Sequence, residues 1–218
     1  MAPLATEPGA GLSERAFDPR TPAAGADLVV YLDIKSPYAF IAREPTLALT
    51  RELGVTVDWR PLTLDIPSYL GSAQLDGRGK VAKSERSPEQ WTAVKYAYRD
   101  ARRYAALLGH TLRGTVKIWD TSLAHIGFAW AVIAGLLADA GADLSGFDDY
   151  RQGPGRARHD REQEAIFEAG IFGVPSYLVD GELLFGREHL PRVRWLLEGR
   201  PGPSPDVAYL PLAGRAHD

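Results

Sequence analysis

The chain has 218 residues, of which 45% are hydrophobic and 24% are charged, and its formal net charge is -3 at pH 7. This length is enough for one sizeable core, or for a core with an inserted subdomain. The weak negative charge gives no general attraction to nucleic acid or to an anionic membrane surface, so neither is an expected partner. The chain contains no cysteine, which excludes disulfides, thiolate nucleophiles and cysteine metal sites.

The N-terminal segment, residues 1–26, is rich in Ala, Pro and Gly and lacks the basic start and apolar stretch of a secretory signal. It is therefore predicted to be a disordered lead. No apolar run in the sequence is long enough to span a membrane. The cytoplasm is the expected compartment.

A strand, a turn and a helix are predicted next. Leu28–Ile34 is a short apolar run that fits a central strand. Ser36 and Pro37 then supply an N-cap and a proline at the first helical position. The helix is predicted over residues 38–53, and a second strand over residues 55–59 completes a β-α-β unit.

The middle of the chain is predicted to be mostly helical. Residues 62–90 are irregular, and the Ser-Pro-Glu-Gln run that begins at Ser87 opens a helix that extends to Gly109. Another helix is predicted over residues 121–140. The run Gly153-Pro154-Gly155 is expected to break the chain before a short helix over residues 160–169.

The last part of the chain predicts a hairpin followed by a helix. Residues 174–179 and 182–185 are joined by Asp180-Gly181, which is a strong signal for a tight β-turn. A final helix is predicted over residues 189–198. The fold class is therefore α/β, with a β-α-β unit, an inserted and shortened all-helical subdomain, and then α-β-β-α.

This order divides the chain into four expected parts. Residues 27–64 and 158–199 form one α/β domain, which the resemblance described next implies to be thioredoxin-like, and residues 65–157 form the helical insertion. Residues 1–26 are the lead, and residues 200–218 are a loose proline-containing tail.

Four segments carry a resemblance to a known family. They are Tyr31 to Ala39, Lys95 to Gly109, Gly170 to Ser176, and Asp180 to Leu190. Through them the chain resembles the DsbA-like thioredoxin superfamily, and within it the 2-hydroxychromene-2-carboxylate isomerases and the kappa-class glutathione transferases. The resemblance implies a thioredoxin-like fold in which a cis-proline faces the start of the first helix.

Ser36 is the candidate catalytic residue. The resemblance places it where redox members of the superfamily carry their reactive sulfur, and it implies glutathione as the cofactor. A serine cannot exchange disulfides, but at a helix N-terminus it can donate a hydrogen bond to a thiolate that arrives on a ligand. The alternative is that Ser36 only caps the helix.

The candidate residues for binding glutathione come from the C-terminal half. Val174-Pro175 is predicted to be a cis bond that faces Ser36, with the Val174 backbone pairing with the tripeptide as an added strand. Gly186, Arg187 and Glu188 follow the hairpin, where Glu188 is placed to pair with the ammonium of the γ-glutamyl end. The alternative for Pro175 is that it only marks the start of an edge strand. The alternative for Arg187 and Glu188 is that they are ordinary charges in the first turn of a helix.

Lys95, Tyr98 and Arg103 are candidates for binding a substrate. They lie on the first predicted helix of the insertion, where a cation can hold a carboxylate. The alternative is a solvated helix face with ion pairs. The five histidines show no metal-ligand spacing, and no metal site is predicted.

The resemblance implies a glutathione-dependent isomerase of the 2-hydroxychromene-2-carboxylate type. Such an enzyme adds and then eliminates the thiolate on a small aromatic-derived carboxylate, without net redox change. A kappa-class-like glutathione transferase and a non-catalytic thioredoxin-like binding module are the alternatives. Relatives are often dimers, so the resemblance also allows a homodimer.

Two features depart from the family pattern. Relatives commonly carry an acidic residue and then an arginine after the glycine that Gly186 matches, whereas this chain has Arg187-Glu188-His189. The insertion is also short, because residues 121–155 have room for about one long helix and a fragment at ~1.5 Å of rise per residue. Both departures bear on activity more than on fold.

Overall fold

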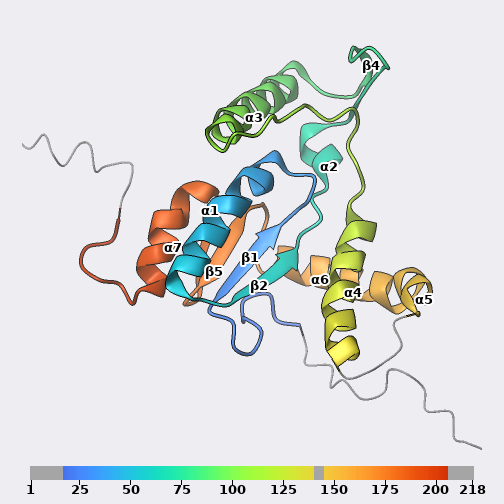
Figure 1. Ribbon diagram of the computed structural model, residues 1–218. Helices are drawn as coiled ribbons and strands as arrows, with labels where there is room; N and C mark the ends of the chain where they lie inside the picture. Colours follow the sequence, from blue (N-terminus) through green and yellow to red (C-terminus); the bar gives the residue numbers. More distant parts are fainter. Residues whose placement is uncertain (1–16, 140–144, 206–218) are drawn as a thin grey trace, which may run out of the picture.

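The computed structural model describes residues 17–139 and 145–205 of the chain. Its main sheet has the strand order β2-β1-β5-β6 (Figure 1). These strands are β1 (Leu28–Leu32), β2 (Val57–Pro61), β5 (Ser176–Val179) and β6 (Glu182–Phe185). Strand β1 runs parallel to β2 and antiparallel to β5, and β5 runs antiparallel to β6.

Strand β1 lies at the centre because both of its faces are apolar. Val29 and Tyr31 pack into one hydrophobic cluster, while Leu28 and Val30 pack into another on the opposite face. This alternation follows from the two-residue period of a strand, and it explains why the sequence shows a continuous apolar run instead of an apolar-polar pattern.

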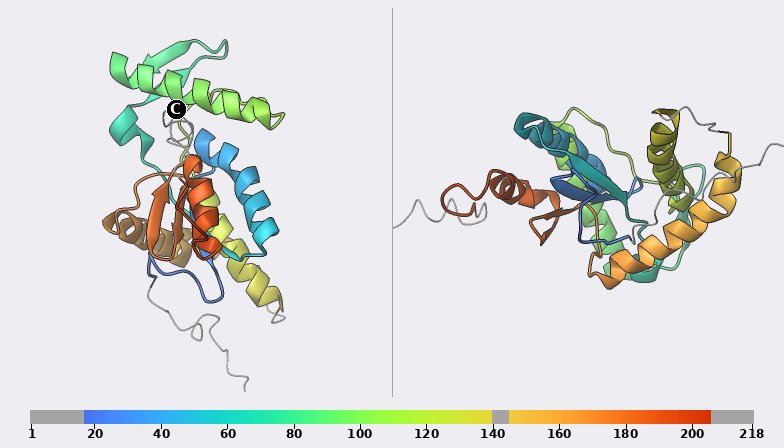
Figure 2. Two further views of the ribbon diagram at one scale, coloured as in Figure 1. Left: turned by 90° about the vertical axis from the view of Figure 1, so that its left-hand side faces the viewer. Right: turned by 90° about the horizontal axis from the view of Figure 1, so that it is seen from below.

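Helices cover both faces of the sheet (Figures 1 and 2). On one face, α1 (Pro37–Leu53) and α7 (Leu190–Leu197) contribute Leu49 and Leu196 to the core. On the other face, α6 (Pro154–Glu168) contributes Ile166. The predicted order of β-α-β and then α-β-β-α is confirmed.

The start of α6 differs from the prediction. Gly153-Pro154-Gly155 was expected to break the chain before a helix over residues 160–169, but α6 begins at Pro154. Proline is tolerated in the first turn of a helix, because the N–H that it lacks has no partner there. A side chain at Gly155 would lie within 2.7 Å of the ring and carbonyl of Tyr150, so this close approach requires glycine.

The insertion contains α2 (Ile66–Leu70), β3 (Ala73–Leu75), β4 (Val81–Ser84), α3 (Pro88–Leu107), α4 (Ser122–Asp139) and α5 (Phe147–Gln152). The expectation of an all-helical insertion is therefore wrong, because β3 and β4 pair as an antiparallel hairpin. The Asp76 side chain accepts hydrogen bonds from the backbone N–H groups of Arg78 and Lys80, and Gly79 has a φ of +77°. An aspartate and a left-handed glycine at these positions stabilise a turn that the sequence patterns did not reveal.

Helix α3 begins at a capping box in which the side chains of Ser87 and Gln90 satisfy each other's backbone N–H groups. It then crosses the start of α1, and Ala101 and Ala105 pack on Ile41 of that helix. This contact holds α3 away from the sheet and leaves space between it and the start of α1.

Part of the segment before β1 packs on the domain, although the whole segment was predicted to be disordered. Residues 17–26 were part of the predicted disordered lead, but Phe17 packs on the core and the Arg20 guanidinium donates hydrogen bonds to the carbonyl of Ala169. The Tyr31 hydroxyl also donates to the carbonyl of Pro19. Residues 1–16 of the lead and residues 206–218 of the tail lie outside the described residues, and the domain boundaries stay a prediction. In the described ranges, no helix combines the length and the apolar character needed to cross a membrane.

Candidate functional site

Ser36 is the N-cap of α1 and is only 8% exposed. Its Oγ accepts a hydrogen bond from the backbone N–H of Ala39 at 3.3 Å, and its own N–H donates to the carbonyl of Asp33 at 2.9 Å. Because Oγ acts here as an acceptor, its hydroxyl proton remains available for a ligand. The capping role is therefore observed, and it is compatible with the predicted role toward a sulfur.

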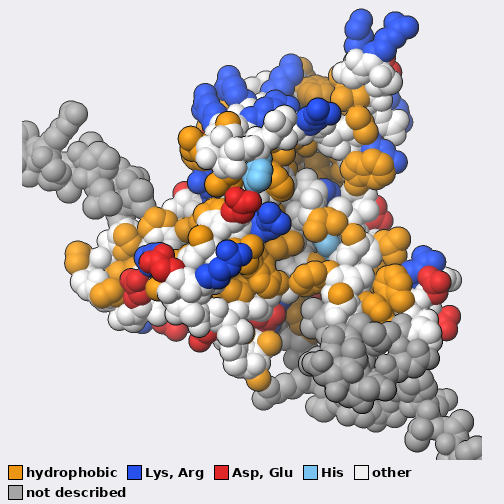
Figure 3. All heavy atoms as spheres, viewed as in Figure 1, with side chains coloured by type: hydrophobic (Ala, Val, Ile, Leu, Met, Phe, Trp, Pro, Cys, Tyr) orange, Lys and Arg blue, Asp and Glu red, His pale blue; other side chains and the backbone are white. Residues whose placement is uncertain are grey.

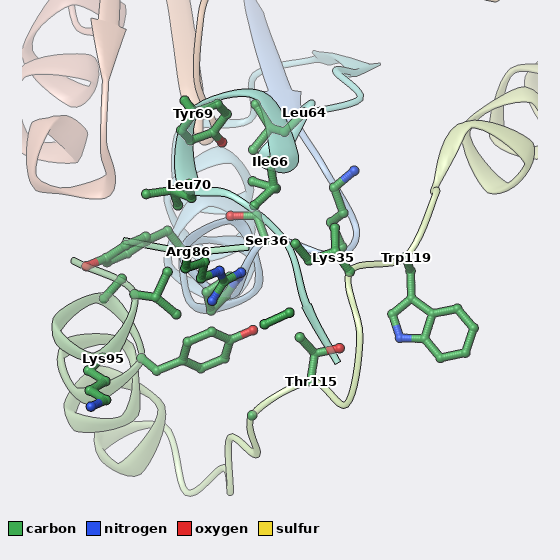
Figure 4. A pocket seen from close by; sticks show the side chains of 18 of the residues that line it. Lys35, Ser36, Leu64, Ile66, Tyr69, Leu70, Arg86, Lys95, Thr115 and Trp119 are labelled. Carbon is green, nitrogen blue, oxygen red and sulfur yellow. The ribbon is translucent and has the colours of Figure 1, made fainter. Parts of the chain in front are cut away.

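A cavity of about 820 Å³ lies between the start of α1 and the insertion (Figure 4). Ser36, Val174, Lys95 and Tyr98 all line it, although they are far apart in the sequence. Four of the nine predicted site residues are thus brought to one place by the fold.

The Val174-Pro175 bond is cis, as predicted. Val174 faces the cavity, whereas Pro175 follows it and accepts a hydrogen bond from the N–H of Gly186 at 2.9 Å. Within the described residues, the N–H and C=O of Val174 form no hydrogen bond. Such backbone groups at a strand end can pair with an extended peptide.

Gly186, Arg187 and Glu188 lie beside the cavity and are not among the residues that line it. The Arg187 guanidinium lies 3.7 Å from the centre of the Tyr104 ring of α3, and its Nε is buried without a hydrogen-bond partner among the described residues. Glu188 is exposed, and its carboxylate lies where a side chain on Gly186 would be. Gly186 has a φ of +103°, a conformation that side chains disfavour.

Arg103 is not brought to the cavity. Its side chain is 64% exposed and lies 3.9 Å from Asp100, one turn earlier on α3. Asp100 instead accepts a hydrogen bond from the hydroxyl of Tyr38, which does line the cavity. Burial, and then the nearby Asp100 charge, raise the pKa of Tyr38 to about 12, so this phenol stays protonated at neutral pH.

The cavity is lined by basic side chains and by no Asp or Glu among the described residues. The basic residues are Lys35, Arg86, Lys95, Arg102 and Lys117. Figure 3 shows Lys and Arg side chains gathered over α3, above a hollow with apolar walls. A wall with one sign of charge attracts an anionic ligand.

Aromatic side chains form much of the remaining wall. Trp91 and Tyr98 come from α3, and Trp119 comes from the segment that leads to α4. Several cations stack on these rings, and the Lys117 ammonium lies 4.1 Å from the centre of the Trp119 ring. A cavity with aromatic faces and basic side chains fits a planar acid.

Sequence analysis missed Arg86 and Lys117, which both line the cavity. The signal that could have found them is weak, because Arg86 and Lys117 lie in irregular segments where periodicity gives no facing direction. Only the packing of these segments around α1 places their side chains in one wall.

Behind Ser36 lies a buried ion pair. The Asp33 carboxylate is fully buried, and its two oxygens accept hydrogen bonds from the backbone N–H groups of Lys35 and Leu64 and from the Thr121 hydroxyl, at 2.9 to 3.1 Å. The Lys35 ammonium lies 3.3 Å from the same carboxylate. Asp33 thus joins the Ser36 turn to the end of β2 and to the start of α4, and sequence analysis had assigned it no role.

Two buried histidines continue this polar cluster. His125 Nδ1 lies 2.6 Å from Thr63 Oγ1, and the same hydroxyl lies 2.9 Å from His159 Nε2. Burial lowers the pKa of His125 to about 4, and the Asp33 carboxylate opposes this shift. In the described ranges, no group of three or more His, Cys, Asp or Glu is arranged to hold a metal ion.

Comparison with known proteins supports the fold assignment. No protein-family model matches the chain. A curated 2-hydroxychromene-2-carboxylate isomerase from Sphingobium xenophagum is 23% identical, and the match covers 73% of this chain and 92% of the relative. This match supports the resemblance to the DsbA-like thioredoxin superfamily on which the predicted fold rests.

Of two solved structures that match the chain, one shows a shared fold. A structure of 2-hydroxychromene-2-carboxylate isomerase matches with a TM-score of 0.53 and 20% identity, covering 79% of this chain and 92% of that one. The cytosolic disulfide reductase DsbM from Pseudomonas aeruginosa matches with a TM-score of 0.42 and 17% identity, covering 87% and 99%. The first match shows a shared fold, and the second is too distant to carry an argument.

The chain's own residues fit glutathione as a cofactor. Ser36 and the N-terminus of α1 offer donors for a thiolate, and the Val174 backbone offers a donor and an acceptor for a peptide. The buried Arg187 Nε has no partner among the described residues, but Arg187 lies beside the cavity and does not line it. Bound there, glutathione would supply a nucleophilic sulfur that this cysteine-free chain lacks.

Proposed function

We propose that the protein is a glutathione-dependent isomerase that acts on a small aromatic-derived carboxylate, of the 2-hydroxychromene-2-carboxylate type. The observation that carries the proposal is the position of Ser36, a buried N-cap that opens onto a cavity with basic and aromatic walls. The curated relative with this name adds support through its sequence.

In this proposal, each part of the cavity has one task. The N-terminus of α1 and the Ser36 hydroxyl hold negative charge on the cofactor's sulfur, because free N–H groups and the helix dipole favour an anion. The Val174 backbone and Arg187 hold the peptide part. Lys95, Lys117 and Arg102 orient the substrate's carboxylate, and Trp119 packs on its ring.

The thiol needs about 2.7 kcal/mol of stabilisation for its pKa to fall from about 8.5 to about 6.5, at 1.36 kcal/mol per pKa unit. A helix dipole contributes ~1 kcal/mol, and a hydrogen bond to a charged group contributes ~2 kcal/mol. The two together are sufficient, so no further cation at the sulfur is required.

Calorimetric titration with glutathione, followed by ultraviolet absorbance of the thiolate across pH, tests the proposal. We expect binding and a thiolate that persists below pH 8. Ser36→Ala should abolish the thiolate at neutral pH while the protein stays folded. Ser204→Ala is the matched control, because Ser204 is exposed after α7 and lies outside the cavity wall. Absence of binding at millimolar glutathione, or an unchanged thiolate in Ser36→Ala, would contradict it.

A glutathione transferase is the second candidate, and the volume of the cavity favours it, because about 820 Å³ admits electrophiles larger than a bicyclic acid. Product analysis separates the two, since an isomerase returns free glutathione whereas a transferase releases a thioether. The binding-module alternative applies if glutathione does not bind. A homodimer and a cytoplasmic location stay predictions.

A further inference from the structure

A chain of hydrogen-bonding groups runs from the cavity wall to the protein surface, and the proposed function does not use it. Its inner half begins at Lys35, which lines the cavity and whose Nζ lies 3.4 Å from Thr121 Oγ1. Thr121 donates to Asp33 Oδ1 at 2.9 Å, and Asp33 Oδ1 lies 3.5 Å from His125 Nε2. All side chains between Lys35 and His125 are buried.

The outer half leads to solvent. From His125 Nδ1 it passes to Thr63 Oγ1 at 2.6 Å and then to His159 Nε2 at 2.9 Å. His159 Nδ1 lies 2.9 Å from Asp160 Oδ1, and the Asp160 side chain on α6 is 60% exposed. The exit is therefore an exposed carboxylate that does not line the cavity.

The hydrogen bonds in the outer half have one consistent direction. The Ile34 backbone N–H donates to His125 Nε2, so a neutral His125 carries its proton on Nδ1 and donates it to Thr63. Thr63 then donates to His159 Nε2, and His159 donates from Nδ1 to the Asp160 carboxylate. In this direction each contact from His125 Nδ1 to Asp160 has one donor and one acceptor, and the 3.5 Å contact between Asp33 Oδ1 and His125 Nε2 receives its proton only during the transfer.

We propose that this chain conducts a proton from the cavity to Asp160 when a thiol is deprotonated beside Ser36. The proposal rests on the proposed function for the identity of that thiol. A ligand that fills the cavity covers Lys35, and the chain then offers an exit that the ligand does not block.

The transfer conserves every proton. The Lys35 ammonium passes a proton through the Thr121 hydroxyl to Asp33 Oδ1, and the resulting amine takes the thiol proton and is an ammonium again. Asp33 passes its proton to His125 Nε2, and the Nδ1 proton of His125 moves to the Thr63 hydroxyl. The original Thr63 proton then moves to His159 Nε2, and the Nδ1 proton of His159 moves to the Asp160 carboxylate. Asp160 releases it to water, and the net change is one proton lost from the sulfur.

Thr63 is the positioning residue on which the route depends, because its single hydroxyl links both imidazoles. It is held at the end of β2 by Gln163 of α6, whose side chain accepts from the Thr63 N–H at 2.7 Å and donates to the carbonyl of Pro61 at 3.1 Å. The charged and titratable groups that face His125 are Asp33, His159, Lys35 and Asp120.

The first test needs no ligand. Nitrogen-15 NMR of the imidazoles in the free protein should show the proton of His125 on Nδ1 and a proton on Nδ1 of His159. A proton on His125 Nε2 would reverse the direction of the chain and overturn the proposal.

The second test measures the rate at which the thiolate absorbance appears after rapid mixing with glutathione. Thr63→Val, which keeps the shape but removes the hydroxyl, should slow this rate at least tenfold without changing the dissociation constant or the final absorbance. Thr63→Ser should restore it to within about twofold of wild type. Equal rates in the Val and Ser variants would overturn the relay.

Two substitutions on the protein surface test the relay without the risk that a change in the buried cluster impairs folding. Asp160→Asn should slow the same step, whereas Glu164→Gln, on an exposed position of α6 outside the chain, should not. Absence of any thiolate in the wild-type protein would overturn the proposed function and the relay's role with it. A wild-type thiolate that forms equally fast in Asp160→Asn and Thr63→Val would overturn the relay alone.

Discussion

The two walls of the cavity differ in how firmly they are held. The wall from the start of α1 and the loop before β5 is buried, with Ser36 8% exposed and Val174 4% exposed. The wall from α3 and the segment before α4 is open, with Trp119 51% exposed and Val116 53% exposed. Side chains in the first wall are fixed by the core and by Asp33, whereas in the second wall cations stack on aromatic rings that are partly exposed.

This difference separates two kinds of task. A substitution in the buried wall disturbs groups that the whole domain holds in place, so it changes folding and chemistry together. A substitution in the open wall changes what the cavity accepts at little cost to stability. Under the proposed function, the reactive end of the site is built into the fold, and its selectivity is set by the insertion.

The largest effect is expected from Asp33→Ala. The change leaves the Lys35 ammonium buried without its partner, and it removes the acceptor for two backbone N–H groups and the Thr121 hydroxyl. We expect the free energy of unfolding in urea to fall by about 3–5 kcal/mol.

Glu85→Ala is the control, since the Glu85–Lys83 pair is exposed and contributes ~1 kcal/mol or less. Similar losses for the two variants would show that the buried wall is no more firmly held than the surface.

The next effect is a loss of stability in acid that comes from His125. Its pKa is lowered to about 4 in the folded protein by burial, against an ordinary value near 6.5. The unfolded chain therefore binds a proton at a higher pH than the folded chain does. Neutral His125 therefore leaves the free energy of unfolding at its full value above pH ~6.5. As the pH falls from 6.5 to 4, protonation of His125 in the unfolded chain lowers the free energy of unfolding by about 3 kcal/mol.

Unfolding measured at pH 7 and pH 4.5 checks this, with His125→Asn as the comparison because asparagine does not titrate. The wild type should lose more stability between the two pH values than the variant. Parallel losses would mean that His125 is not the group responsible.

A smaller effect is expected from Gly173→Ala, which lies in the loop before β5, at the edge of the buried wall. A Cβ at this position would lie 2.5 Å from the Phe185 ring, which lines the cavity and is 43% exposed. The ring has room to turn, so we expect a stability cost of about 1 kcal/mol and weaker glutathione binding by calorimetry.

Gly77→Ala is its control, because no atom lies within 4 Å of a Cβ at that position. If glutathione binds Gly173→Ala as tightly as wild type, this edge of the cavity does not contact the ligand.

The smallest effect is expected in the open wall. Lys117→Ala removes a cation that stacks on Trp119, and we expect the affinity for an aromatic carboxylate to fall by about 0.5–1 kcal/mol, or roughly two- to fivefold. Stability should change by less than about 0.5 kcal/mol. Lys83→Ala, an exposed basic residue of β4 outside the cavity wall, should leave the affinity unchanged in the same titration.

Much of the fold was predictable because local signals agreed with tertiary packing. Ser36-Pro37 predicted the start of α1, and Asp180-Gly181 predicted the turn between β5 and β6. The start of α6 was not predicted, because a proline such as Pro154 can either break a helix or occupy its first turn. The β3–β4 hairpin was not predicted, because both of its strands are short.

For the candidate site, the sequence predicted the residues that lie on recognisable motifs. Ser36, Val174, Lys95 and Tyr98 reach the cavity, while Arg103 points elsewhere on the same helix as Lys95 and Tyr98. A helical repeat gives the spacing of side chains but not which face meets the cavity, because the contact of α3 with α1 decides that.

The sequence by itself determined the composition, the order of the strands in the main sheet and of the helices that cover it, and the exclusion of thiol chemistry by the chain's own residues. These properties depend on residue type and on neighbours within a few positions. Only the tertiary structure decided that Asp33, Thr63, His125 and His159 meet in one buried chain, and that Arg86 and Lys117 share a wall. Their spacing in the sequence carries no signal, because contacts between distant segments are set by how whole elements pack.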